Sequence, residues 1–397
     1  MAIPSVLPAC AFCGGNKSCV IQYGQFPMAP RATKEIAVRT FDFAVGTCDS
    51  CGLIQLMHPA DPSVLYEEFK NDVIGEKLAK HRMAFKEFLK LHIKKDDKLF
   101  EIGAGDGTLA TLLHDSFDRR VDITINDINN INRVRSDFYC VDGCFETAIV
   151  RRKYDVIYSS LVFEHICNYD EHLRKVRTIL RAGGKFIMSV PNIEAWLERQ
   201  FLNTFSQEHT IYAFKEDVCD LLSRYGFVLQ SSSDYSDYSI FLCFTRDNDE
   251  NVGAGHNGKV MIERKNTLLA NYHRFLQALA GFINDQAKGR TLHIFGANSS
   301  AQILLRMLSD ENRRRVRFIF DNSPLKQEKY LYGFNLTIKS PTMVKLLGSN
   351  DAVLVFMGAF DSEIILQLRS YNDQVIIISR RDFDERNPVE TSKRTES

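Results

Sequence analysis

The chain has 397 residues, and its 50 lysine and arginine residues are balanced by 50 aspartate and glutamate residues. This balance lacks the basic excess typical of proteins that bind the phosphate backbone of nucleic acids, so we expect no nucleic-acid partner. A hydrophobic fraction of 45% and a charged fraction of 25% speak against wholesale disorder, and the length predicts two or three domains.

The sequence contains no apolar run of the length that spans a bilayer. Its first ten residues contain no basic stretch followed by a long apolar stretch, so we expect no secretory signal. The ten cysteines are therefore expected to be thiols or metal ligands of a cytoplasmic protein, rather than disulfide partners.

Two pairs of cysteines lie in the turn-rich first part of the chain. Cys10-Ala-Phe-Cys13 and Cys48-Asp-Ser-Cys51 are separated by 34 residues. Two C-x-x-C pairs supply four thiolates for a tetrahedral zinc ion. Because four protein ligands leave no open position, such a zinc ion is expected to be structural. The alternatives are unrelated buried cysteines or a redox pair, although one pair would suffice for redox chemistry.

A helical pattern over residues 64–92 is followed by short apolar runs that alternate with amphipathic segments up to about residue 246. This alternation predicts a mostly parallel sheet flanked by helices. The expected strands are residues 98–102, 121–126, 155–158, 185–190, 227–231 and 240–245.

The polar, glycine-containing segment 247–258 predicts a linker. Apolar residues at three- and four-residue steps then predict a helix with one buried stripe over 268–283. A second alternating pattern predicts strands at 291–295, 316–320, 352–356 and 375–378. We therefore expect an α/β protein with three domains, at residues 1–65, 66–246 and 259–385.

A glycine-rich turn joins the first expected strand of the middle domain to a helix. Gly103, Gly105 and Gly107 allow a sharp turn and a close approach to a ligand at the start of the helix. Glu101 precedes the turn, and Asp127 ends the second strand, which suits binding of a ribose diol. The G-x-G-x-x-G spacing of a dinucleotide site is missing. Either acid could instead be a solvated loop residue.

Together with segments 154–166 and 180–192, this arrangement resembles the class I S-adenosylmethionine methyltransferases over residues 98–246. The resemblance implies a Rossmann-like catalytic domain with S-adenosylmethionine as its cofactor. It also implies the cofactor-binding residues, which are Glu101, Gly103, Gly105, Asp127 and, beside the adenine, Asp142. For Asp142 the alternative of a solvated loop residue remains open.

The order of the motifs resembles a narrower group, the sugar C-methyltransferases that act on nucleotide-linked 4-keto-deoxysugars. That group has an N-terminal four-cysteine zinc domain, a central methyltransferase and a C-terminal Rossmann-like domain, and segments 48–56, 293–297 and 320–327 match its pattern. The resemblance implies a small, nucleotide-linked sugar as the substrate, with a product that enters a surface polysaccharide or glycosylated metabolite. The single glycine of the C-terminal turn, Gly296, argues against a dinucleotide there. The C-terminal domain is expected to hold the substrate or to pack against the catalytic domain.

In that group a histidine within a Tyr-His-Glu-His run acts as the base. This chain reads Ser206-Gln-Glu-His209, so the resemblance assigns the base to His209 and its support to Glu208. A neutral imidazole can remove a proton from the carbon beside a ketone, and a neighbouring carboxylate can orient it. His165 keeps a position near the substrate. The alternatives are a lid or packing role for His209 and a core position for His165.

Two other functions remain open at this point. An oxygen or nitrogen methyltransferase needs no carbon acid, so His209 would matter less in such an enzyme. A non-catalytic binding or scaffold subunit would keep the fold without turnover, although Glu101 and Asp127 argue for cofactor binding.

Overall fold

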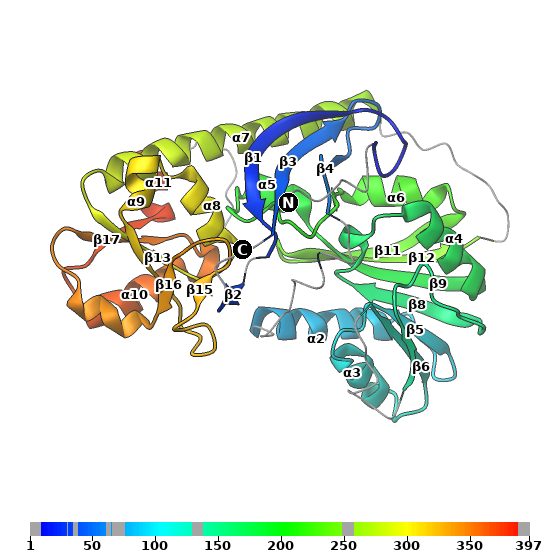
Figure 1. The fold of residues 1–397 in the computed structure, drawn as a ribbon. Helices are drawn as coiled ribbons and strands as arrows, with labels where there is room; N and C mark the ends of the chain where they lie inside the picture. Colours follow the sequence, from blue (N-terminus) through cyan, green and yellow to red (C-terminus); the bar gives the residue numbers. More distant parts are fainter. Residues whose placement is uncertain are drawn as a thin grey trace.

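The computed structural model describes residues 9–29, 31–34, 39–60, 65, 76–128, 138–247 and 258–387. These residues form one four-stranded sheet and two seven-stranded sheets with helices packed on them (Figure 1). The expected α/β class, with a Rossmann-like middle part and an α/β C-terminal part, is confirmed. Most of segment 247–258, the expected linker, lies outside the described residues.

The central sheet has the strand order β11-β12-β9-β8-β5-β6-β7. Six of these strands run in the same direction, and β12 runs opposite to them. Its strands are β5 (Lys98–Ile102), β6 (Asp122–Asp127), β7 (Tyr139–Asp142), β8 (Tyr154–Ser160), β9 (Leu180–Pro191), β11 (Phe227–Tyr235) and β12 (Ser239–Arg246). The six strands expected from the sequence are present, and β7 is an additional one.

Helices cover both faces of this sheet (Figure 1). They are α2 (Glu76–Lys90), α3 (Thr108–Ser116), α4 (Tyr169–Ile179) and α6 (Lys215–Ser223). The short helix α5 (Ile193–Glu198) instead packs Ile193 and Leu197 into the hydrophobic core that the N-terminal and C-terminal parts of the chain share. Leu99 packs with α2 and α3, whereas its neighbour Phe100 packs with α4 and α6. Successive side chains of a strand point to opposite faces, so both faces of an apolar strand need a helical layer.

The chain order of the strands reverses at β5, which lies between β6 and β8. In open α/β sheets, ligands bind outside the carboxyl ends of the strands at such a reversal. We therefore expect a ligand to bind beside the ends of β5 and β8, where the glycine turn begins.

The C-terminal sheet has the order β18-β17-β13-β14-β16-β15-β2. Its strands are β13 (Thr291–Phe295), β14 (Val316–Phe320), β15 (Tyr330–Leu331), β16 (Thr337–Lys339), β17 (Asp351–Val355), β18 (Ile376–Ser379) and β2 (Ala32–Thr33). The helices around it are α7 (Lys259–Ala287), α8 (Ser299–Met307), α9 (Asp310–Arg314), α10 (Asp361–Tyr371) and α11 (Arg380–Arg386). The first two expected strands match β13 and β14 in full, and the buried stripe of α7 contains the expected residues from Leu269 to Ile283.

The third sheet joins parts of the chain that are far apart in sequence. Its strands are β1 (Lys17–Pro27), β3 (Thr40–Cys48), β4 (Ile54–Leu56) and β10 (Ile211–Tyr212), in that order. β10 comes from the expected catalytic domain, and β2 of the N-terminal segment extends the C-terminal sheet by pairing with β15. The domain boundaries remain a prediction, but the N-terminal segment shares a sheet with a strand of each of the other two parts of the chain.

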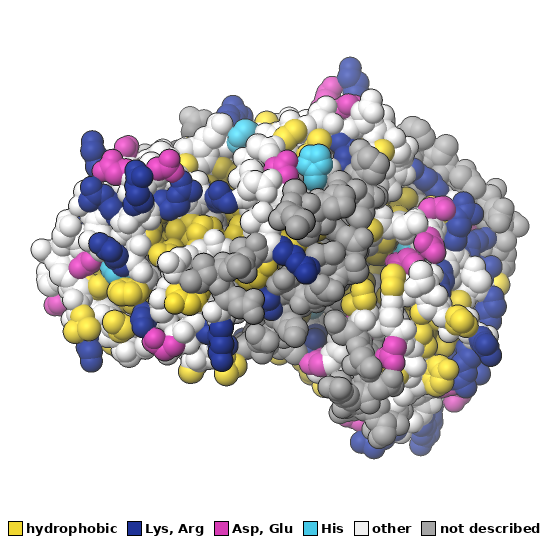
Figure 2. Space-filling view, in the orientation of Figure 1, with side chains coloured by type: hydrophobic (Ala, Val, Ile, Leu, Met, Phe, Trp, Pro, Cys, Tyr) yellow, Lys and Arg dark blue, Asp and Glu magenta, His cyan; other side chains and the backbone are white. Residues whose placement is uncertain are grey.

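On the face shown in Figure 2, Lys and Arg side chains are interspersed with Asp and Glu side chains. At α9, Arg313 within the helix pairs with Asp310, and Arg315 just after it pairs with Glu311. Among the helices that the structure describes, none combines the length and the apolar character needed to cross a bilayer.

Candidate functional site

The four cysteines of the two pairs lie on two tight turns. In each turn the backbone folds back on itself: the Gly14 amide donates to the Cys10 carbonyl, and the Gly52 amide donates to the Cys48 carbonyl, both at 2.9 Å. Gly14 and Gly52 have φ values of +71° and +70°, which favour glycine. Residues of the first pair thus meet residues of the second, and both turns present their thiols to one centre.

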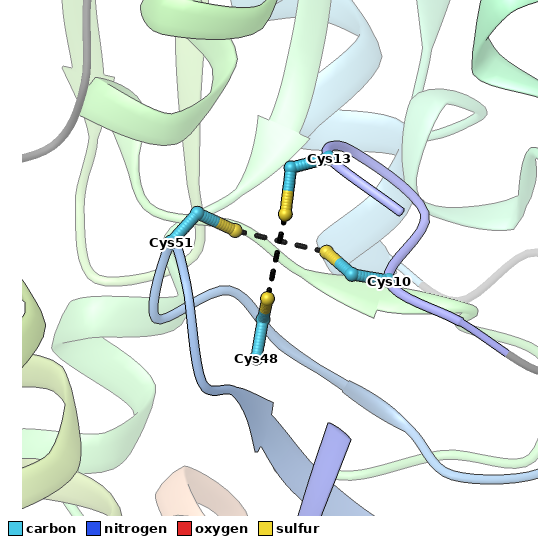
Figure 3. A group of neighbouring side chains, drawn as sticks. All are labelled: Cys10, Cys13, Cys48 and Cys51. Atoms are coloured by element: carbon cyan, nitrogen blue, oxygen red, sulfur yellow. Dashed lines mark hydrogen bonds between the residues drawn. The ribbon is translucent and has the colours of Figure 1, made fainter. Parts of the chain in front are cut away.

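The four sulfur atoms converge on a common point (Figure 3). All lie within 4.8 Å of one another, with 3.6 Å between Cys10 and Cys51 and 3.4 Å between Cys13 and Cys48. A tetrahedral zinc ion with bonds of about 2.3 Å to sulfur separates its ligands by about 3.8 Å. The cluster is therefore compatible with a zinc ion, as its spacing in the sequence predicts.

The glycine turn connects β5 to α3 at the carboxyl edge of the central sheet. Gly103, Gly105 and Gly107 have φ values of +70°, +56° and +69°. The Gly105 amide donates to the Asp127 carboxylate at 2.7 Å, which ties the turn to the end of β6. Asp142 ends β7 and lies opposite Asp127 in the parallel register. The structure thus brings together these predicted cofactor residues from three neighbouring strands.

Glu101 lies beneath the turn and is 2% exposed. Its carboxyl group accepts a hydrogen bond of 3.1 Å from the hydroxyl of Tyr158 on β8, a residue that the sequence reasoning did not select. Burial raises the pKa of Glu101 to about 8, although Tyr158 and the more distant Arg82 favour the ionised form. A ligand that brings a positive charge close to Glu101 would therefore favour its ionised form.

His165 and His209 meet beyond the end of β8, at the same edge of the sheet. His165 ends the short 3₁₀ helix Phe163–His165, and His209 precedes β10. The two rings lie 4.9 Å apart at an interplanar angle of 83°, and the Trp196 ring is stacked 6.5 Å from His209. The structure thus brings together two of the three predicted catalytic side chains.

Both imidazoles are held in the neutral form. Burial lowers the pKa of His165 to about 4, and burial together with nearby His165 lowers the pKa of His209 well below its usual range. A neutral imidazole can accept a proton, which a base requires. Burial also raises the pKa of Glu208 and of neighbouring Glu164 to about 8.

Glu208 reaches the histidine pair through its backbone. Its carbonyl oxygen lies 3.1 Å from Nδ1 of His165, so that nitrogen carries the proton and donates. Within the described ranges, no hydrogen bond or ion pair joins the Glu208 carboxyl group to His209. Glu164, which the sequence reasoning did not select, lies closer to the pair, with 3.9 Å between its Oε1 and Nε2 of His165. Its position next to His165 in the sequence was the available signal.

The segment that carries His209 is held on both sides by backbone hydrogen bonds of Thr210. The Thr210 amide donates to the Glu164 carbonyl at 2.8 Å, and its carbonyl accepts from the Leu56 amide at 3.1 Å. Phe12, inside the first cysteine pair, packs edge-on against Tyr169, whose hydroxyl lies 3.3 Å from Oγ1 of Thr210. The four-cysteine segment thus supports the histidine site.

The turn after β13 has the same backbone-to-aspartate hydrogen bond as the glycine turn, but the surroundings of its aspartate differ. The Ala297 amide donates to Asp321 at 2.8 Å, and Nζ of Lys326 lies 3.1 Å from the same carboxylate oxygen. A Cβ atom at Gly296 would lie 2.4 Å from the sulfur of Met357, so Met357 closes over the turn. Because Lys326 pairs with Asp321 and Met357 covers the turn, Asp321 is less suited than Asp127 to bind a ribose.

Two family models match the chain. Residues 75–232 match the model described as a methyltransferase domain, and residues 265–378 match the model described as a C-methyltransferase C-terminal domain. No curated protein gives a significant match. The first match covers the central sheet up to β11, and the second covers most of the C-terminal sheet. The chain is therefore an enzyme with a methyltransferase domain.

Several solved structures are similar to part of the chain. PH0226 from Pyrococcus horikoshii OT3 is 20% identical with a TM-score of 0.39, over 46% of this chain and 98% of that chain. A putative sarcosine dimethylglycine methyltransferase from Galdieria sulphuraria is 14% identical with a TM-score of 0.35, over 46% and 88%. A putative S-adenosylmethionine-dependent methyltransferase from Listeria monocytogenes is 14% identical with a TM-score of 0.34, over 42% and 100%.

Proposed function

We propose that this S-adenosylmethionine-dependent methyltransferase methylates the carbon beside the ketone of a nucleotide-linked keto-deoxysugar, with His209 as the base. The observation that carries the proposal is Nδ1 of His209, which is buried and has no hydrogen-bond partner among the described residues. The match of residues 265–378 to a C-methyltransferase C-terminal domain supports transfer to carbon. The sugar itself is supported by the order of the sequence motifs, and its product would enter a polysaccharide or glycosylated metabolite.

We assign cofactor binding to the carboxyl edge of the central sheet. Asp127 is positioned by its hydrogen bond to the Gly105 amide, and Asp142 lies beside it at the end of β7. Gly103 and Gly105 provide a turn without side chains, and Glu101 provides a buried carboxyl group at the strand reversal. When bound, S-adenosylmethionine supplies a methyl group on a sulfonium, and its transfer to carbon forms a C–C bond as the C–S bond breaks.

The residues of the histidine site have separate roles in this scheme. His209 removes the proton from the carbon beside the ketone, which leaves an enolate on the substrate, and holds that proton until it passes to solvent. His165, whose Nδ1 donates to the Glu208 carbonyl, holds its ring against His209. Glu208 is a positioning residue through its backbone. The four cysteines hold structural zinc and support the segment of Thr210.

Proton exchange tests the base directly. The enzyme, S-adenosylhomocysteine and a nucleotide-linked 4-keto-deoxysugar in deuterated water should show deuterium uptake at the carbon beside the ketone. His209→Asn should reduce both exchange and methylation by about 10²–10⁴-fold. His273→Asn on α7, whose ring contacts Gln277, is the matched control and should behave as wild type. Near-normal methylation by His209→Asn would reject the base and favour an oxygen or nitrogen acceptor.

Calorimetric binding of S-adenosylmethionine tests the cofactor assignment separately. Asp127→Ala should weaken binding by about tenfold or more, because it removes the acceptor of the Gly105 amide and the expected ribose ligand. Asp122→Ala changes the same residue type at the exposed start of β6 and should leave binding unchanged. Equal affinities of the two variants would reject the assignment of Asp127.

A further inference from the structure

We infer that Glu164, His165 and His209 form a second metal site, separate from the four cysteines, which binds a divalent ion of the zinc type. One donor atom from each residue lies within 4.8 Å of the other two. The group comes from two segments, the 3₁₀ helix after β8 and the residue two positions before β10.

Two atoms of the group are buried without a partner. Oε2 of Glu164 and Nδ1 of His209 have no hydrogen bond to any part of the chain that the structure describes. Buried polar atoms in folded proteins are nearly always paired, so each orphan calls for an explanation. Glu164 lines a small cavity whose other walls, from Phe163 to Val218, are apolar side chains that donate no hydrogen bond. A carboxylate oxygen and an imidazole nitrogen are both ligands of zinc-type cations, so a bound cation would account for both atoms.

The tautomer of His165 is set for metal binding. Its Nδ1 donates to the Glu208 carbonyl, which can only accept, so its Nε2 carries the lone pair. That nitrogen faces Oε1 of Glu164 at 3.9 Å. Histidines that bind metals usually donate their other N–H to a carbonyl or carboxylate, which fixes the ring in this manner.

The two segments are held together before any ion binds. The Thr210 amide donates to the Glu164 carbonyl at 2.8 Å, and the Thr210 hydroxyl donates to the Ile166 carbonyl at 2.6 Å. These bonds lie directly beside the three ligands. The ligands therefore need only side-chain adjustment to close on an ion, which lowers the ordering cost of binding.

Two imidazoles and one carboxylate favour zinc, cobalt or nickel over magnesium and calcium, which prefer oxygen ligands. Three protein ligands also leave a position open for water or a substrate oxygen. A bound ion occupies the lone pair of His209 that the proposed reaction needs. Zinc beyond the one equivalent that the four cysteines bind should therefore inhibit C-methylation. This inhibition rests on the proposed function, whereas binding of the second metal ion does not.

Cobalt titration tests the site in protein that already holds one zinc ion per chain. Cobalt should bind as a second equivalent and give visible bands without the thiolate-to-metal absorption of cysteine ligation. Glu164→Gln and His209→Gln should each weaken this binding by tenfold or more, whereas His273→Gln should not. A folded wild-type protein that binds no second equivalent would overturn the inference, as would unchanged binding in both ligand variants.

An activity assay separates this inference from the proposed function. Excess zinc should reduce methylation in wild type, and chelation of the second ion alone should restore it. Binding of a second ion without any C-methylation would reject the proposed function and retain the metal site. C-methylation that is insensitive to zinc, in a protein without a second equivalent, would reject the metal site and retain the proposed function.

Discussion

The Leu56 amide donates a hydrogen bond of 3.1 Å to the Thr210 carbonyl, which joins the strand after the second cysteine pair to the residue after His209. This bond continues into the pairing of β4 with β10, where Gln55 lies opposite Ile211. The four-cysteine segment therefore forms one wall of the histidine site, although no cysteine belongs to that site. Under the proposed function, a metal held by the four cysteines would be coupled to catalysis through the position of this backbone.

Loss of the structural metal should reduce the turnover rate more than it reduces the affinity for the cofactor. Cys10→Ser should lower the zinc content and the unfolding temperature, by about 5–10 °C, and should reduce turnover by about tenfold or more because His209 is displaced. Cofactor affinity should change little, since its predicted ligands lie on β5, β6 and β7. Cys19→Ser, outside the four-cysteine cluster, is the control. Full turnover in zinc-free protein would contradict the coupling.

Glu101 should make the cofactor-free protein less stable as the pH rises. Its pKa is raised from 4.5 to about 8 by burial, so the unfolded chain loses this proton at lower pH than the folded chain does. The stabilising contribution is present below pH 4.5 and is lost as the pH rises toward 8. Relative to Glu101→Gln, wild type should lose about 4 kcal/mol of unfolding free energy over this interval. Denaturant titrations at several pH values measure it; parallel curves for the two proteins would refute the shift.

Gly103 should tolerate alanine less well than Gly183 does. Both have φ near +70°, so alanine costs about 1–2 kcal/mol at either position. A Cβ atom at Gly103 would lie 2.5 Å from Cγ2 of Val162, whereas one at Gly183 meets nothing within 4 Å. Gly103→Ala should therefore cost about 1–3 kcal/mol more, and Val162→Ala should recover part of it. Equal unfolding free energies for the two alanine variants would show that the backbone or Val162 moves to relieve the close contact, and would contradict the prediction.

Of the two lysines of α7, Lys265 should be the one whose substitution destabilises the protein more. Its side chain is fully buried and forms an ion pair with Asp217 at the start of α6, close to the Cys51 carbonyl. Lys265→Met leaves a buried carboxylate without its cation and should cost about 3–5 kcal/mol in unfolding free energy. Lys259→Met, on the same helix and 90% exposed, should cost less than about 0.5 kcal/mol. Similar losses of unfolding free energy in both variants would contradict a stabilising role for the ion pair between Lys265 and Asp217.

Local sequence patterns were sufficient where a structural element is decided by its own residues. The strand limits at β5, β13 and β14 agree with the predictions, because each is a short apolar run that must be covered on both faces. The cysteine turns and the glycine turn were also predictable, since ligand spacing and φ > 0 are local requirements. β1, β3 and β7 were not expected, because their mixed polar and apolar residues resemble loops until a partner strand is present.

The histidine site depends on contacts between distant parts of the chain. The sequence placed Glu208 beside His209 as a carboxylate, whereas in the structure Glu208 contacts His165 through its carbonyl. The segment of Glu164 and His165 meets that of His209 because Thr210 binds the Glu164 backbone carbonyl across 46 positions of the sequence. The resemblance of the motifs to known families thus predicted the class of the enzyme and its candidate cofactor ligands, and the spacing of the cysteines predicted the candidate metal ligands. The neighbours of each side chain were decided by the tertiary structure, because strand pairing and burial between remote segments set hydrogen bonds and pKa values together.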